Sequence, residues 1–188
     1  LDFSAELAKA KASGAEALFV FYPGKAGGAF MKQYEQAGLA DKLPLYTVFT
    51  VDAISLPKLQ QANMKAVLGS LTTGFWGPGL KNPQNARFVE GFLKKYGRYP
   101  SFYAAQSYDS IFLINSAVEA VGGNLQDRDG MRAAMENADF PSVRGSFSYG
   151  ANHFPIQNFY LLEVVDDGNG NWFTEIRSTV FENHQDTY

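Results

Sequence analysis

Cysteine is absent from this 188-residue chain, and histidine occurs only twice. Without cysteine the chain has no disulfides, no thiolate nucleophile and no Cys-based zinc site. His153 and His184 stand far apart, outside any metal-binding spacing such as HExxH. The sequence also has no GxSxG turn and no phosphate-binding loop. We therefore expect no enzyme: no catalytic residues, no metal and no cofactor.

Basic residues are also too few to point to nucleic acid. Sixteen Lys and Arg against nineteen Asp and Glu give a formal charge of -3, which leaves no positive excess for a phosphate backbone. No apolar run approaches the roughly 20 residues that span a bilayer, so we expect no direct membrane insertion. The chain starts at Leu1 with a helix signal and no signal peptide before it, which predicts a processed or truncated chain.

Apolar residues are plentiful, and their pattern in the first 73 residues alternates between strand and helix. Hydrophobic residues make up 46% of the chain, enough for a packed core. Short, uninterrupted apolar runs are typical of parallel strands buried on both faces. The predicted strands are residues 17–22, 45–49 and 67–73, and the predicted helices are one that ends at Gly14, then residues 29–37 and 56–62. This alternation predicts a parallel α/β sheet.

The pattern changes after Thr73. A glycine-rich stretch at residues 74–79 is the best candidate for a linker or hinge. The predicted elements that follow are helices at residues 83–96, 102–121 and 128–138, then strands at residues 143–149, 159–165 and 172–181. The three helices have apolar faces but no strands between them, so we infer that they pack on strands from a chain segment outside this sequence.

Three features could belong to a ligand site. Loops at the carboxyl ends of parallel strands are where α/β folds bind ligands. The loop from Gly24 to Gly28 either contacts a ligand through its amides or is a plain tight turn. Asp52 either faces a ligand or caps the helix at Leu56, and Asp109 lies near a cleft or, as we favour, bonds to backbone. For His153 we expect a structural or solvent role.

Aromatic residues, 15% of the chain, gather near the predicted loops and hinge. They either line an apolar ligand cleft or belong to the core. The residues concerned are Phe21, Tyr22, Phe49, Phe75, Trp76, Phe102, Tyr103 and Tyr108.

Several segments stand out in order along nearly all of the chain. They are the run from residues 2–4 (DFS) through 22–24 (YPG), then residues 30–39 (FMKQYEQAGL), 82–83, 88–89, 96–97, Pro100, 103–109 (YAAQSYD), 144–147 (RGSF), 152–157 (NHFPIQ) and Tyr160. Together these segments resemble the periplasmic substrate-binding proteins of ABC transporters for branched-chain amino acids, especially members that take up aromatic acids.

This resemblance implies an α/β fold of the type I periplasmic-binding-protein kind, with two parallel-sheet lobes joined by crossovers. Family members are about twice this length, so the chain is expected to be the C-terminal half. Residues 1–73 would belong to the second lobe and residues 74–156 would return to the first lobe, mainly as helices. Residues 157–188 would cross back to the second lobe as β structure.

The function implied by the resemblance is that of a periplasmic solute-binding component of an ABC transporter. It would bind a small organic acid, an aromatic carboxylate or a branched-chain amino acid, in an interlobe cleft by hinge closure. Its partners would be that ligand, the transporter permease and the missing N-terminal half of the same protein. The alternatives are a ligand-sensing domain of a receptor or regulator with the same fold and, from another class, an α/β enzyme.

The resemblance also implies which residues contact the ligand. The expected ligand-binding residues are Phe21, Tyr22, Gly24, Lys25, Phe49, Thr50, Asp52, Trp76 and Tyr103. Amino-acid binders of this family have an acidic residue near the second of these loops. Asp52 is the nearest acid, but the uncharged Thr50 is closer to the aligned position. That difference favours an aromatic carboxylate, with Lys25 near its charge.

Overall fold

A computed structural model describes residues 1–187, which fall into two compact units. Unit 1 comprises residues 1–74 and 161–178, and unit 2 comprises residues 75–160 and the segment from Thr179 onward. The first boundary lies inside the glycine-rich stretch predicted to be a hinge. The segment from Thr179 onward groups with unit 2 by its contacts, whereas the resemblance implies that residues 157–188 belong to the second lobe.

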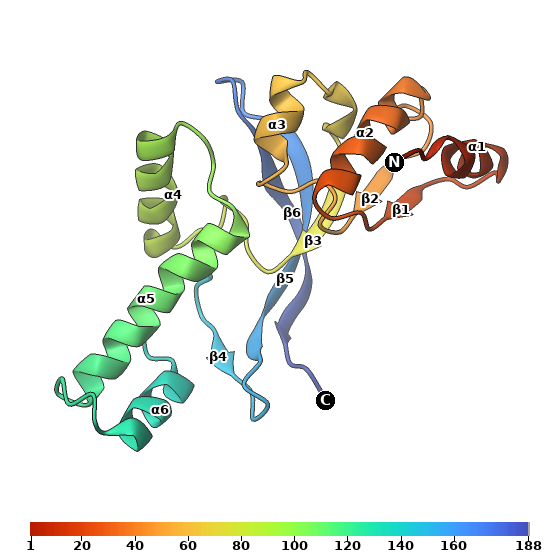
Figure 1. The fold of residues 1–188 in the computed structure, drawn as a ribbon. Helices are drawn as coiled ribbons and strands as arrows, with labels where there is room; N and C mark the ends of the chain where they lie inside the picture. The colour runs from red at the N-terminus through yellow and green to blue at the C-terminus, as the bar shows by residue number, and fades with distance from the viewer. Residues whose placement is uncertain (188) are drawn as a thin grey trace. The chain divides into compact units, whose positions relative to one another are not determined.

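Unit 1 contains the predicted alternation of helices and strands (Figure 1). Its elements are α1 (Ser4–Ala12), β1 (Leu18–Val20), α2 (Lys25–Gln36), β2 (Leu45–Thr47), α3 (Leu56–Gln61), the 3-10 helix η1 (Lys65–Val67) and β3 (Leu71–Gly74). Strands β1, β2 and β3 are parallel neighbours, with Leu18 opposite Leu45 and Tyr46 opposite Leu71. The prediction of a parallel sheet is therefore confirmed.

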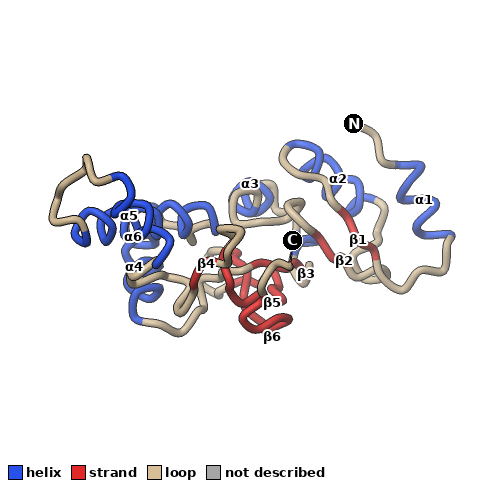
Figure 2. The backbone as a smooth tube through the Cα atoms, turned by 90° about the horizontal axis from the view of Figure 1, so that it is seen from below, coloured by secondary structure: helices blue, strands red, loops and turns tan. Residues whose placement is uncertain are grey.

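Strand alternation gives the sheet of unit 1 one covered face and one open face. Val20, Leu45 and Thr47 are buried on the face that α2 and α3 cover (Figures 1 and 2). Phe19 and Tyr46 are register partners on the other face, and Phe19 is 70% exposed. The core between sheet and helices contains Phe3, Leu7, Phe30, Met31, Tyr34, Leu39, Leu43, Val51, Leu56, Leu59 and Val67.

Unit 2 is mainly helical, as predicted. Its helices are α4 (Pro83–Tyr96), α5 (Phe102–Ala120) and α6 (Arg128–Asn137). Each begins at a side-chain cap, because Asn82, Ser101 and Asp127 accept hydrogen bonds from backbone amides of their own first turns. The core of unit 2 contains Trp76, Phe88, Val89, Ala105 and Val143.

Part of the apolar surface of these helices stays exposed. On α5, Ile111 is 67% exposed and Ile114 is about half exposed, and α6 has no buried residue. An amphipathic helix normally packs its apolar face against another layer. Ile111 and Ile114 remain exposed among the described residues, and packing of these helices on strands outside this sequence stays a prediction.

Two long strands close the chain. Strand β5 (Pro155–Asp166) pairs with β6 (Trp172–His184), and both run from one unit into the other. The turn between them is held by Asp167, whose Oδ1 accepts the amides of Asn169 (2.7 Å) and Asn171 (3.0 Å). A two-residue strand β4 (Ser148–Tyr149) pairs antiparallel with the start of β5.

Three predicted boundaries were wrong. Helix α2 begins at Lys25, so Gly27 and Gly28 lie inside the helix instead of in a loop. The strand predicted over residues 67–73 covers only Leu71–Gly74, because Val67 ends a 3-10 turn. The strand predicted over residues 143–149 is reduced to β4, because the backbone of Val143 bonds to side chains and not to a neighbouring strand.

Candidate ligand site at the ends of β1 and β2

Two exposed aromatic side chains meet where β1 and β2 end. Phe21 directly follows β1, and Phe49 follows β2 by two residues. They are 56% and 43% exposed, and their rings meet edge to face with centroids 6.2 Å apart and planes at 70°. The carboxyl ends of parallel strands are the usual ligand position in open α/β sheets. The structure thus brings together two predicted site residues as a small apolar surface.

The backbone of Phe49 is in the left-handed region, with φ of 52°. A bulky aromatic residue seldom adopts this conformation, and the cost is on the order of 1–3 kcal/mol. The surrounding hydrogen bonds hold it, since Val48 donates to the carbonyl of Val20 (3.1 Å) on the neighbouring strand.

Thr50 follows Phe49 in the chain and is 1% exposed. Its hydroxyl accepts the amide of Tyr22 (2.8 Å) and lies within donating distance of the carbonyl oxygens of Val48 (3.2 Å) and Val20 (3.4 Å). Because the hydroxyl is buried and bonded inside the protein, Thr50 holds the two loops together and does not face outward.

The ring of Tyr22 also turns inward. Its centroid lies 4.8 Å from that of Phe3 and 5.4 Å from that of Phe30, both core residues. Tyr22 is therefore half-buried against α1 and α2, while its amide is bonded to Thr50.

The amino-terminal end of α2 comes directly after Tyr22 and Pro23 in the chain. Gly24 stands at the cap position with a φ of 68°, a conformation that favours glycine, and Lys25 is exposed in the first turn. The first turn contains no acidic residue. The partial positive charge of a helix amino terminus, together with a lysine, favours an anionic group nearby.

Asp52 caps the turn that leads into α3. Its Oδ1 accepts the amides of Ile54 (2.9 Å) and Ser55 (2.8 Å), and its own amide donates to the Ser55 hydroxyl. These bonds stabilise the turn ahead of α3 and do not cap the helix itself, because the cap position of α3 is Ser55 and no side chain among residues 1–187 bonds to an amide of its first turn.

The remaining two predicted site residues lie in unit 2. Trp76 is buried in the core, where its Nε1 donates to Asn85 Oδ1 (2.8 Å) and its ring meets Phe88 edge to face. Tyr103 is half exposed on α5, with its ring 4.0 Å from that of Phe102. The burial of Trp76 favours a role in packing over one in ligand contact.

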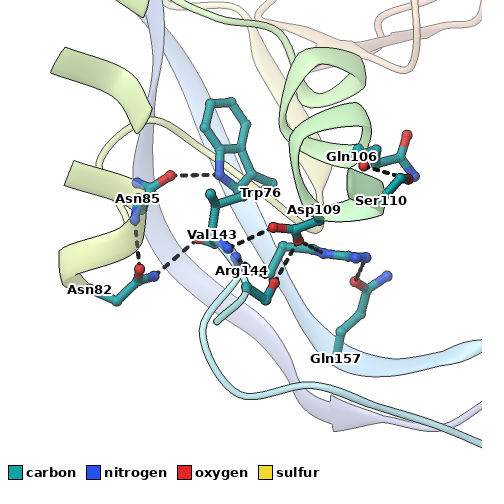
Figure 3. A network of polar contacts seen from close by, with 10 residues as sticks. Trp76, Asn82, Asn85, Gln106, Asp109, Ser110, Val143, Arg144 and Gln157 are labelled. Carbon is teal, nitrogen blue, oxygen red and sulfur yellow. Dashed lines mark hydrogen bonds and ion pairs between the residues drawn. The ribbon is translucent and has the colours of Figure 1, made fainter. Parts of the chain in front are cut away.

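Sequence reasoning missed Arg144, which forms an ion pair with Asp109 (Figure 3). Asp109 is 1% exposed; its Oδ1 accepts the amide of Val143 (2.9 Å), and its Oδ2 accepts Ser142 Oγ (2.6 Å) and Arg144 Nε (3.0 Å). The expected bond from Asp109 to backbone is therefore present. A carboxylate on the buried side of an apolar helix could have suggested a cationic partner, because buried charges are normally paired.

Arg144 extends this network to other parts of unit 2. Its Nη1 donates to Gln157 Oε1 on β5 (3.2 Å), and its guanidinium lies 4.2 Å from the ring centroid of Phe147 and 5.9 Å from that of Phe75. Nearby, the Asn82 side chain donates to the carbonyl of Val143 (3.0 Å). The loop at residues 142–144 is thus bonded to α5, to β5 and, through Asn82, to the segment just before α4.

The histidines behave as ordinary side chains. His153 is exposed in a turn, 3.3 Å from Glu136, and His184 packs against Phe159 and Phe181. Among residues 1–187, no group of three His, Cys, Asp or Glu side chains is placed to hold a metal ion. No helix in the same range has both the length and the apolar character to cross a membrane.

Open α/β sheets bind small molecules at the carboxyl ends of their strands, and in this chain that position presents the exposed rings of Phe21 and Phe49. The model of the periplasmic binding protein family matches residues 1–169, and the chain belongs to this family. The expected resemblance and fold class are thereby confirmed.

Individual relatives agree with this family assignment. The chain is 31% identical over 180 residues to Leu/Ile/Val-binding protein homolog 6 of Brucella abortus (strain 2308), covering 93% of this chain and 45% of the relative. An ABC transporter solute-binding protein from R. palustris in complex with benzoate superposes with a TM-score of 0.83 at 30% identity, covering 99% of this chain and 49% of that one. The first relative is thus named for amino-acid binding, and the second is a solute-binding protein of an ABC transporter.

A second structural neighbour extends the ligand range. A solute-binding protein from Rhodopseudomonas palustris BisB5 in complex with 3,4-dihydroxybenzoic acid has a TM-score of 0.82 and 28% identity, covering 99% of this chain and 50% of that one. The chain thus spans about half the length of the relatives that it matches.

Proposed function

We propose that this chain is the C-terminal half of the solute-binding component of an ABC transporter, and that the whole protein binds a small aromatic carboxylate. The observation that carries the proposal is the exposed edge-to-face pair of Phe21 and Phe49 at the ends of β1 and β2. An aromatic pair in this geometry contributes about 0.5–1.5 kcal/mol of interaction free energy beyond the free energy gained by burying its apolar area. The benzoate and dihydroxybenzoate complexes of the structural neighbours support it.

The charges near this pair suit an acid without an ammonium group. Lys25 and the amino-terminal end of α2 favour a carboxylate. Asp52, the nearest candidate partner for an ammonium group, uses Oδ1 to cap the turn before α3. The names of the Brucella relatives support a branched-chain amino acid as the alternative ligand.

We propose the preceding half of the protein as the partner that covers the open surfaces. Unit 1 has an open surface around Phe19 and Tyr46, and unit 2 has one around Ile111 and Ile114. The coverage of about half of each relative supports this. In this proposal unit 1 belongs to the second lobe and unit 2 to the first.

The proposed mechanism is closure of the lobes about the crossovers, one of them at residues 74–79, because a ligand that binds the closed state better shifts the equilibrium toward it. The liganded protein would then deliver its solute to a permease from the periplasm.

The test uses the full-length protein in thermal melts and calorimetry with benzoate, 4-hydroxybenzoate, leucine and isoleucine. Ligand at 100 times its dissociation constant adds about 2.7 kcal/mol to the stability of the folded state. We expect benzoate or 4-hydroxybenzoate to raise the melting temperature and the amino acids to leave it unchanged. A shift with leucine alone would refute the aromatic-acid assignment.

Matched variants locate the binding surface. Phe21→Ala and Phe49→Ala should each weaken benzoate binding at least tenfold, because each removes half of the ring pair. Phe181→Ala, which removes an equally exposed phenylalanine from β6, should leave affinity unchanged.

A further inference from the structure

We propose that Thr50 and Gly27 are positioning residues, which hold Phe49 in its left-handed conformation so that the Phe21 and Phe49 rings meet a flat ligand ring in a fixed geometry. This inference rests on the proposed function, since the ligand it concerns is an aromatic carboxylate. Neither residue touches that ligand in the proposal, and both act through Phe49.

The first observation is that Phe49 is exposed and at the same time strained. Its φ of 52° is disfavoured for a bulky side chain, and an exposed ring gains little from burial to offset that cost. Strain of this kind persists only where the surroundings determine the backbone, and it is concentrated at ligand clamps and similar functional positions.

The second observation is how completely Thr50 joins the two loops. Its hydroxyl bonds to the amide of Tyr22 from the β1 loop and to the carbonyl of Val48 from the β2 loop. With Val20 also in reach, one buried side chain fixes the chain directions on both sides of Phe49 and just after Phe21.

The third observation concerns the first turn of α2. A Cβ placed on Gly27 would lie 2.9 Å from the Thr50 carbonyl oxygen and even closer to that of Tyr22. Only glycine lets the helix pack directly on both loop backbones. The neighbouring Gly28 has nothing within 4 Å of the same position, so the close approach is specific to Gly27.

These contacts together pre-organise the ring pair. A loop already held in its binding conformation loses less conformational entropy when the ligand binds. Edge-to-face geometry also discriminates, because an aromatic ring gains from it and a saturated ring of similar size does not. Thr50 and Gly27 should therefore control both affinity and the preference for aromatic over alicyclic acids.

The experiment measures binding of benzoate and cyclohexanecarboxylate to the full-length protein by calorimetry. Thr50→Val keeps the shape but removes the hydroxyl, and Thr50→Ser keeps the hydroxyl. We expect Thr50→Val to weaken benzoate at least tenfold and cyclohexanecarboxylate much less, so that the ratio of the two affinities falls. Thr50→Ser should stay within about threefold of the wild type for both acids.

Variants of Gly27 and Gly28 give an independent test if Thr50→Val does not fold. Gly27→Ala should lower the same affinity ratio, whereas Gly28→Ala should bind both acids as the wild type does and melt at the same temperature or higher. A third comparison needs no ligand: Phe49→Gly should melt at least as high as Phe49→Ala, the reverse of the usual order, because glycine adopts a positive φ without strain.

The outcomes separate this inference from the proposed function. If the wild type binds no aromatic acid, the proposed function is refuted and this inference with it. If the wild type binds benzoate and Thr50→Val or Gly27→Ala loses affinity for both acids equally, the positioning role is refuted while the proposed function stands. Unchanged affinity in those variants also refutes the positioning role alone.

Discussion

Replacing Arg144 with methionine should remove much more stability than the loss of an exposed charge does. The change deletes the ion pair to Asp109 (3.0 Å) and the bond to Gln157 (3.2 Å), and it leaves a carboxylate at 1% exposure. Breaking a buried pair by removing one partner costs about 3–5 kcal/mol. Because Val143 and Ser142 still donate to Asp109, we expect about 3 kcal/mol, the lower end of that range.

The assay is urea unfolding of the full-length protein at pH 7, with Arg177→Met as the matched control. Arg177 pairs with Glu163 (2.7 Å) and Glu175 (2.5 Å) on an exposed part of β6, where ion pairs contribute about 0–1 kcal/mol. The double variant Asp109→Leu with Arg144→Met should lose less than the sum of the two single losses, because no unpaired charge remains. A loss below 1 kcal/mol for Arg144→Met, equal to that for Arg177→Met, would refute the reasoning.

Three further predictions concern polar groups elsewhere. Burial, aided by the charge of Asp41, raises the pKa of Tyr34 above its usual 10.0. The contribution of the neutral Tyr34 to stability is therefore complete below pH 10 and is lost as the pH rises through the raised pKa. Above pH 10, the free energy of unfolding of Tyr34→Phe should fall less steeply with pH than that of the wild type. Asn85→Ala leaves Trp76 Nε1 and two backbone carbonyls without their partner and should cost about 2–4 kcal/mol in urea unfolding, and a loss below 1 kcal/mol would contradict the network. Asp52→Ala should lower stability by about 0.5–1.5 kcal/mol, because the turn before α3 loses its side-chain acceptor, with benzoate affinity unchanged; a tenfold loss of affinity in calorimetry would instead assign Asp52 to the ligand.

Helices with strong end signals were predictable from sequence. Asn82 followed by Pro83, and an aspartate at position 127 or 129, predicted the starts of α4 and α6. In the structure the side chains of Asn82 and Asp127 accept amides of the first turns of these helices. Such local bonds need no tertiary context.

Boundaries that depend on distant partners were not predictable. The glycines of α2 are a loop signal in sequence, but Gly27 is required by the carbonyl oxygens of Tyr22 and Thr50, which approach from two other segments. The backbone of Val143 is likewise drawn out of a strand by Asn82 and Asp109, each more than 30 positions away.

The candidate site was likewise predictable from sequence only in part. The sequence located the loops after β1 and β2 and the aromatic residues in them, because apolar runs mark parallel strands whose carboxyl ends bind ligands. It could not tell which side chains face outward: Phe21 and Phe49 do, whereas Thr50 and Trp76 are buried and bonded within the protein.

The amino-acid order alone determined an α/β chain without cysteine, with capped helices and aromatic strand ends, since each of these follows from composition or from neighbours within a few residues. Only the tertiary structure decided that Arg144 neutralises Asp109, that Asp52 caps a turn, and that the hydroxyl of Thr50 bonds to the loops after β1 and β2 on either side of Phe49. The physical reason is that burial and hydrogen-bond partners come from segments far apart in the chain, which only folding brings together.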